Sequence, residues 1–128
     1  KDLAKAMTQV IGNSNAIKQI YNISDNRYIT FDGLARACAV AAGKSPEDIQ
    51  IVHYDPKKFD FGKRKAFPMR MQHFFASVNK AMTELDWYPD YDLTSGLKDS
   101  FKNDYLASER NKKEIDFSIY DEILKAVG

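Results

Sequence analysis

The stretch TFDGLARACAVAAGKSPEDIQIVHY, residues 30–54, decides the fold that the sequence predicts. It reads as a helix, a turn and a strand. Thr30 can cap the helix, a stripe of apolar residues shares one helical face, and Gly43 stands where a C-terminal cap belongs. The stripe includes Cys38, which we therefore expect in the core. Residues 49–54 form the best candidate strand of the chain and end at Asp55-Pro56.

The same patterns extend the prediction toward both ends of the chain. Apolar residues at helical spacing predict four further helices, at residues 3–11, 77–86, 94–105 and 118–127. Residues 20–23 predict a second short strand. Ser77 and Thr94 stand where N-terminal caps belong. The predicted fold class is therefore α/β, mostly helices with two or three short strands.

Length and composition are those of a globular chain. The 128 residues suit one domain, and 44% hydrophobic with 29% charged residues excludes a disordered or fibrous chain. No apolar run approaches the roughly 20 residues that cross a bilayer, so we expect no membrane partner. The single cysteine excludes a disulfide within these residues and fits a reducing compartment. The first residue is lysine rather than methionine, which leads us to expect one lobe of a larger fold.

A net charge of +1 hides an uneven distribution. Residues 57–75, which we call the basic segment, carry six basic residues and one acid, or +5, whereas the remaining 13 basic and 17 acidic residues give −4. The six are Lys57, Lys58, Lys63, Arg64, Lys65 and Arg70. We predict a long, partly ordered loop here, and ordered loops of this length inside a compact domain are usually functional.

Five phenylalanines are interleaved with these charges: Phe59, Phe61, Phe67, Phe74 and Phe75. Basic side chains neutralise phosphates and aromatic rings stack on bases, so the pattern suits single-stranded or looped RNA. The alternative is that the rings anchor the loop to the core while the lysines solvate its outer side, and this explains Phe59 and Phe61 well. The charge excess favours a phosphate-bearing ligand, held by the six basic residues and His73, with Phe74 or Phe75 stacking on an unpaired base.

No complete active site can be recognised in these residues. His73 could act as a general acid or base in RNA cleavage, with Arg70 or Lys65 stabilising the transition state, but a histidine that contacts backbone or phosphate is the simpler interpretation. The separation of His53 from His73 argues against zinc, and we predict no metal site. A glycine-rich phosphate loop and a catalytic triad are both missing.

Several stretches resemble known families. The opening KDLAKA, IYNI at residues 20–23 and residues 77–89 resemble the C-terminal part of extended short-chain dehydrogenase/reductases, a superfamily that contains nucleotide-sugar epimerases. More narrowly, five stretches look like the chloroplast stem-loop-binding proteins and their cyanobacterial relatives: YITFDGLA (28–35), IVHY (51–54), FDFGK (59–63), KAFP (65–68) and QHFFA (72–76). Asp86 departs from the superfamily, which usually has glycine there, so the helix end must either tolerate a left-handed residue or close differently.

This resemblance implies an RNA-binding protein of the chloroplast stroma or the cyanobacterial cytoplasm, associated with ribosomes. Some members cleave stem-loops with the help of a divalent cation. It also implies that residues 1–128 are a C-terminal lobe without a cofactor of its own, whose partner is an N-terminal Rossmann half that holds any NAD(P) site. Homo- or hetero-oligomers are also compatible with it.

Two alternatives to RNA binding stay open. The chain could be the substrate-binding lobe of an NAD(P)-dependent nucleotide-sugar epimerase or reductase, because the resemblance to the superfamily implies that Arg70 lies near where epimerases hold the nucleotide diphosphate. It could also be a structural module, whose apolar helix faces dock against another part of the protein or another subunit.

Overall fold

The computed structural model describes residues 1–68, 72 and 75–128. Five α-helices lie in these ranges: α1 (Asp2–Gln9), α2 (Phe31–Ala41), α3 (Asn79–Leu85), α4 (Leu93–Ser100) and α5 (Ser118–Val127). Shorter turns are η1 (Ser14–Ala16), η2 (Pro46–Asp48), η3 (Pro56–Lys58), η5 (Arg110–Lys112) and the π-helical η4 (Phe101–Leu106), which continues α4. The five predicted helices are therefore confirmed, with some bounds shorter than the sequence patterns indicated.

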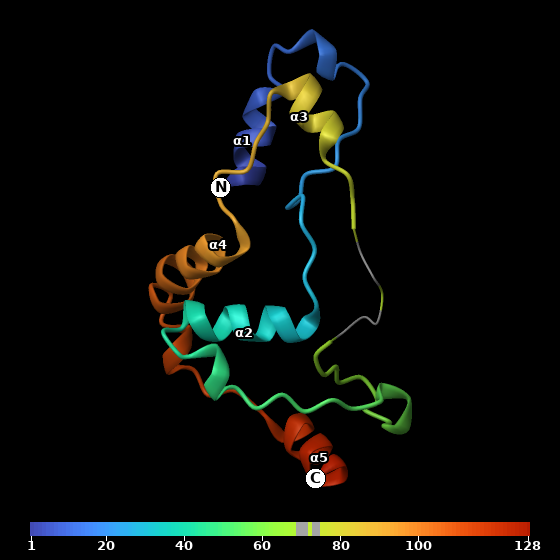
Figure 1. Cartoon of the computed structure of the whole chain (residues 1–128), viewed down its shortest axis with the longest axis vertical. Coiled ribbons are helices and arrows are strands. Elements are labelled where there is room, and N and C mark those ends of the chain that lie inside the picture. Colours follow the sequence, from blue (N-terminus) through green and yellow to red (C-terminus); the bar gives the residue numbers. More distant parts are fainter. Residues whose placement is uncertain (69–71, 73–74) are drawn as a thin grey trace.

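The helices are spread along the long axis of an elongated molecule, in an order that differs from their order in the sequence (Figure 1). α1 and α3 lie together at one end, α2 and α4 pack against each other in the middle, and α5 lies at the other end. Residues 17–30 run as an open stretch along the long axis from the α1 end to α2. The chain thus has a cluster of buried side chains near each end rather than one central core.

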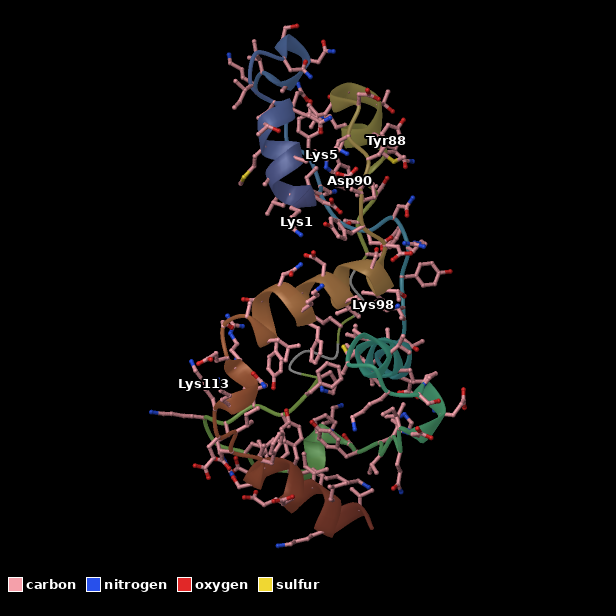
Figure 2. The ribbon with its side chains drawn as sticks, turned by 90° about the vertical axis from the view of Figure 1, so that its left-hand side faces the viewer. Lys1, Lys5, Tyr88, Asp90, Lys98 and Lys113 are labelled. Carbon is pink, nitrogen blue, oxygen red and sulfur yellow. The ribbon has the colours of Figure 1, made fainter. Side chains whose placement is uncertain are left out.

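The first cluster, the α1–α3 core, is built around Trp87, whose side chain is 1% exposed. Ala6 of α1 and Ala81 and Leu85 of α3 are buried against it. The Trp87 indole Nε1–H donates to the backbone oxygen of Asp2 at 3.0 Å, which ties the start of α1 to the end of α3. Figure 2 shows Lys5 reaching the same connection, where its ammonium donates to the Tyr88 carbonyl at 3.0 Å and pairs with Asp90.

The second cluster, the α5 core, joins α5 to the first half of the basic segment. Ile119 and Ile123, four residues apart on one face of α5, are buried together with Ala66. Tyr54, Phe59, Phe61 and Tyr120 pack against them and are partly buried. The basic segment is therefore attached to a helix from the far end of the sequence.

The α/β fold class was wrong. Within the described ranges, the structure contains helices and turns but no strand. Residues 20–23 and 49–54, which we predicted as strands, are drawn as open chain, and their backbones form no backbone hydrogen bond with any described residue. A strand needs a ladder of hydrogen bonds to a neighbouring segment. The composition of these stretches favoured extended backbone, but no described segment pairs with either of them through backbone hydrogen bonds.

The helix ends test the predicted caps. The Thr30 hydroxyl accepts from the Gly33 N–H at 3.1 Å, which confirms it as the cap of α2. Asp86 ends α3 in the left-handed region at φ 52°, so it does adopt the conformation that glycine usually supplies. The Thr94 cap was wrong: Asp92 caps α4, because its carboxylate accepts from the Ser95 N–H at 2.7 Å.

Much of the apolar surface faces solvent. The accessible surface is 10,233 Å², whereas a compact protein of 14.6 kDa exposes about 6,900 Å². Cys38 is exposed rather than in the core. The buried residue of α2 is its neighbour Ala39, so the face of α2 that packs against the protein is not the apolar face that the sequence predicted. In the described part of the chain, no helix is long and apolar enough to cross a membrane.

Candidate nucleic-acid interface

Two tight turns shape the described half of the basic segment. The Asp55 carboxylate accepts from the Lys57 N–H at 3.0 Å and caps η3, which begins with Pro56. The Asp60 carboxylate accepts from the Gly62 N–H at 3.0 Å, and Gly62 has a φ of 58°, a conformation that favours glycine. These turns are local, so the short polar residues and the glycine account for them without help from the core.

The lysines of this segment are available to a ligand. Lys57, Lys58, Lys63 and Lys65 are all exposed. None of the four forms a salt bridge with any residue that the structure describes. Four positive charges close together in the sequence, without acidic partners, create an attractive field for a polyanion.

Arg64 has a different role from the lysines. Its guanidinium donates two hydrogen bonds to the Glu122 carboxylate on α5, both at 3.0 Å. These hydrogen bonds, with the charge of Glu122, raise the pKa of Arg64 above its usual value. The fork-to-fork geometry occupies both terminal nitrogens, so we expect Arg64 to hold the basic segment on α5 rather than to contact phosphate.

The phenylalanines divide into two groups. Phe59 and Phe61 stack on each other with ring centroids 5.4 Å apart and belong to the α5 core, which confirms the anchoring interpretation for this pair. Phe67 and Phe75 are 42% and 61% exposed. Each meets a second aromatic ring edge-on: Phe67 packs on Phe31 at 5.2 Å and Phe75 on Tyr28 at 5.9 Å.

Tyr28 and Phe31 were missed in the sequence. Both flank Thr30 at the start of α2, and their exposed fractions are 87% and 42%. Local sequence predicts the helix that begins there but does not show that rings of the basic segment, more than 30 residues later, come to lie beside it. These two contacts bring the start of α2 and the aromatic residues of the basic segment to the same surface.

The backbone of Phe67 is held on both sides by tyrosine hydroxyls. Tyr54 donates to its carbonyl oxygen at 3.0 Å, and the Phe67 N–H donates to the Tyr120 hydroxyl at 3.3 Å. Partial burial raises the pKa of Tyr54 above its usual value, so its hydroxyl keeps the proton that it donates. The exposed ring of Phe67 therefore sits on a backbone fixed from two separate parts of the chain.

Three predicted site residues, Arg70, His73 and Phe74, lie outside the described residues. The other histidine, His53, is exposed, and its Nε2 lies 3.0 and 3.1 Å from the two carboxylate oxygens of Asp32. Among the described residues, no three His, Cys, Asp or Glu side chains gather in a way that could hold a metal ion.

Comparison with known proteins gives one clear similarity. The chain is 56% identical over 124 residues to an Arabidopsis thaliana protein, chloroplast stem-loop binding protein of 41 kDa b. It resembles a stem-loop binding protein of chloroplasts. The match covers 97% of this chain and 32% of the relative, so the chain spans about a third of the relative's length. The predicted resemblance to the chloroplast stem-loop-binding proteins is thereby confirmed.

The wider resemblance, to the short-chain dehydrogenase/reductases, stays a prediction. No protein-family model matches the chain. No solved structure matches it either.

Proposed function

We propose that this chain binds RNA in the chloroplast, as part of a stem-loop binding protein. The observation that carries the proposal is the group of four exposed lysines, none in a salt bridge with a described residue, on a segment that Arg64, Phe59 and Phe61 fix to α5. Lysines contact phosphates, and this contact is the main source of affinity for nucleic acids. The similarity to the Arabidopsis protein, whose name states stem-loop binding and chloroplast location, supports the same reading.

The exposed aromatic rings favour a looped or unpaired substrate over a plain duplex. Bases in a duplex stack on one another, whereas unpaired bases are free to stack on side chains. Phe67 and Phe75 follow the lysines in the sequence and are exposed, as are their partners Phe31 and Tyr28. A stem-loop offers both the phosphates of a strand and unpaired bases to such a surface.

The expected salt dependence tests this proposal. If the four lysines and Arg70 each neutralise one phosphate, the slope of log affinity against log salt is about −3.5, from about 0.7 per contact for a single strand. Fluorescence anisotropy with a labelled stem-loop RNA between about 50 and 200 mM salt measures it. A slope near zero would mean that phosphate neutralisation does not drive binding.

RNA cleavage and the epimerase alternative gain no support from the described residues. His73, the candidate acid or base for cleavage, and Arg70, on which the epimerase alternative rests, both lie outside them. Binding of a divalent cation or NAD(P), association with ribosomes and oligomer formation stay predictions.

The exposed apolar surface favours a second role, docking within the same protein. Leu3, Met7, Val10 and Ile11 recur at helical spacing along α1 and just beyond it, and they are 40–80% exposed. Because the relative is about three times as long as this chain, we infer that further polypeptide of the same protein covers this face.

Oxidation of Met7 tests the docking role. Its side chain is 63% exposed, so peroxide should oxidise it rapidly in the 128-residue chain. We expect Met7 to be oxidised at least tenfold more slowly when the chain is joined to the further polypeptide of the same protein, because a covered thioether is protected from peroxide. Mass spectrometry of the Met7 peptide measures both rates. Equal rates would show that the α1 face is open.

A further inference from the structure

We propose that a groove beside the basic segment binds one unpaired nucleobase of the RNA, a base with an exocyclic amino group. The inference rests on the proposed RNA binding and deepens it. Phe67 is among the phenylalanines that the sequence pattern singled out, but neither that pattern nor the similarity assigns the groove beside it to a site.

The groove lies between α2 and the open stretch 49–54. Figure 1 shows this stretch running beneath α2, with the chain around residues 65–68 near the start of the helix. The cavity measures about 380 Å³, within the range of roughly 300–1,000 Å³ for small-molecule sites. Most of its lining is apolar, with Phe31, Ala35, Ile51, Tyr54, Phe67 and Pro68 among the residues.

The aromatic rings of the groove suit a flat ligand. Phe31 and Phe67 meet at an interplanar angle of 82°, and each side chain is 42% exposed, so part of each ring is accessible to a base. The two tyrosine hydroxyls already hold the Phe67 backbone in place. Less conformational entropy is therefore lost when a base stacks on the Phe67 ring. Stacking of a base on an aromatic side chain changes affinity by about 5- to 150-fold.

The polar group of the groove gives it a preference among bases. Asp32 and His53 both line the cavity, and the imidazole Nε2 is 3.0 Å from the nearer carboxylate oxygen. The Asp32 side chain is 48% exposed, which leaves the carboxylate able to accept a further hydrogen bond. The amino groups of adenine, cytosine and guanine can donate one, whereas uracil offers only its N3–H, which lies between two carbonyl oxygens that repel a carboxylate. We therefore expect the groove to discriminate against uracil.

The lysines of the basic segment lie next to the groove-lining residues in the sequence. Lys57 and Lys58 follow Tyr54 within four residues, and Lys63 and Lys65 precede Phe67 by four and two. Each of the two stretches that line the groove therefore has two of these lysines beside it. When the phosphates of an RNA strand contact the lysines, we expect the bases of that strand to lie close to the groove. This arrangement favours a base over an unrelated apolar ligand, because the same RNA satisfies both parts of the surface.

The test uses a stem-loop RNA with 2-aminopurine at each loop position in turn. We expect quenching of its fluorescence at one position on binding, because stacking on an aromatic ring quenches the base. Phe67→Leu keeps an apolar side chain but removes the ring, so it should abolish this quenching and lower the affinity about tenfold. The salt slope should not change, since all lysines remain. Tyr88→Ala, which removes an exposed ring remote from the groove, should behave as the wild type.

A second variant tests the polar group. Replacing the quenched base by uracil should lower wild-type affinity about tenfold, the value of one hydrogen bond to a charged group. Asp32→Ala should lose this preference, and circular dichroism identifies any variant that fails to fold.

If Phe67→Leu binds and quenches like the wild type, or if no loop position is quenched in the wild type, the groove does not hold a base, whereas the salt slope still reports on RNA binding itself. Loss of the salt slope as well would overturn the proposed function.

Discussion

Replacing Lys57, Lys58, Lys63 and Lys65 together by alanine is expected to lower the affinity for stem-loop RNA about 600-fold at about 0.1 M salt. Each phosphate contact contributes about 0.7 to the slope of log affinity against log salt, and the log of 0.1 M salt is −1. Losing four contacts therefore lowers the log of the affinity by about 2.8 at this salt concentration. The four side chains are exposed and form no salt bridge with a described residue, so the fold should survive their loss. Arg64 stays in the variant because its hydrogen bonds to Glu122 hold the segment on α5.

A matched variant removes four other lysines: Lys98, Lys102, Lys113 and Lys125. They too are exposed and form no salt bridge with any described residue. Lys98 lies on α4, and Figure 2 shows Lys113 well separated from it along the chain. The change in net charge is the same, so general attraction between a cationic protein and RNA falls equally in the two variants. We expect less than a tenfold loss of affinity in this control. Equal losses in the two variants would contradict a site in the basic segment.

Trp87→Ala is expected to be among the most destabilising single changes in the chain, by about 4 kcal/mol. The side chain is 1% exposed in the α1–α3 core, and its indole N–H is bonded to the backbone of Asp2. Truncation leaves a cavity among Ala6, Val78 and Leu85 and frees the start of α1. Because small domains are stable by only about 5–15 kcal/mol, most of the folded population of a marginal chain would be lost.

Chemical denaturation followed by circular dichroism measures this loss. Tyr88→Ala is the control, since the neighbouring ring is 49% exposed and its carbonyl, which accepts from Lys5, belongs to the backbone. We expect a change within about 0.5 kcal/mol for this surface position. A Trp87→Ala variant as stable as the wild type would contradict the packing of α1 on α3.

The helices could be predicted because their information is local. Thr30 caps α2 three residues before the N–H that it accepts from, and apolar spacing marks the five helices that the structure describes. The strands could not be decided this way. Residues 49–54 have the composition of a strand, but a strand exists only where another segment pairs with it, and no local pattern reports that partner.

The site was predictable in its charge and less so in its geometry. A run of lysines can be read directly from the sequence, and so can the aromatic residues between them. Which rings are buried depends on distant contacts: Phe59 and Phe61 pack beside α5, whereas Phe67 reaches Phe31. The same holds for Arg64, whose partner Glu122 is 58 residues away. The sequence pattern does not distinguish the side chains that anchor the segment from those that stay exposed, because tertiary packing decides which is which.

The most direct test compares salt slopes. The wild type, the four-lysine variant of the basic segment and the control variant are titrated with the same stem-loop RNA between about 50 and 200 mM salt. RNA binding by this segment predicts slopes of about −3.5 for the wild type and the control, and about −0.7 for the four-lysine variant, in which Arg70 alone remains of the five contacts. A four-lysine variant with the slope of the wild type would contradict the assignment of the RNA interface to residues 57–75.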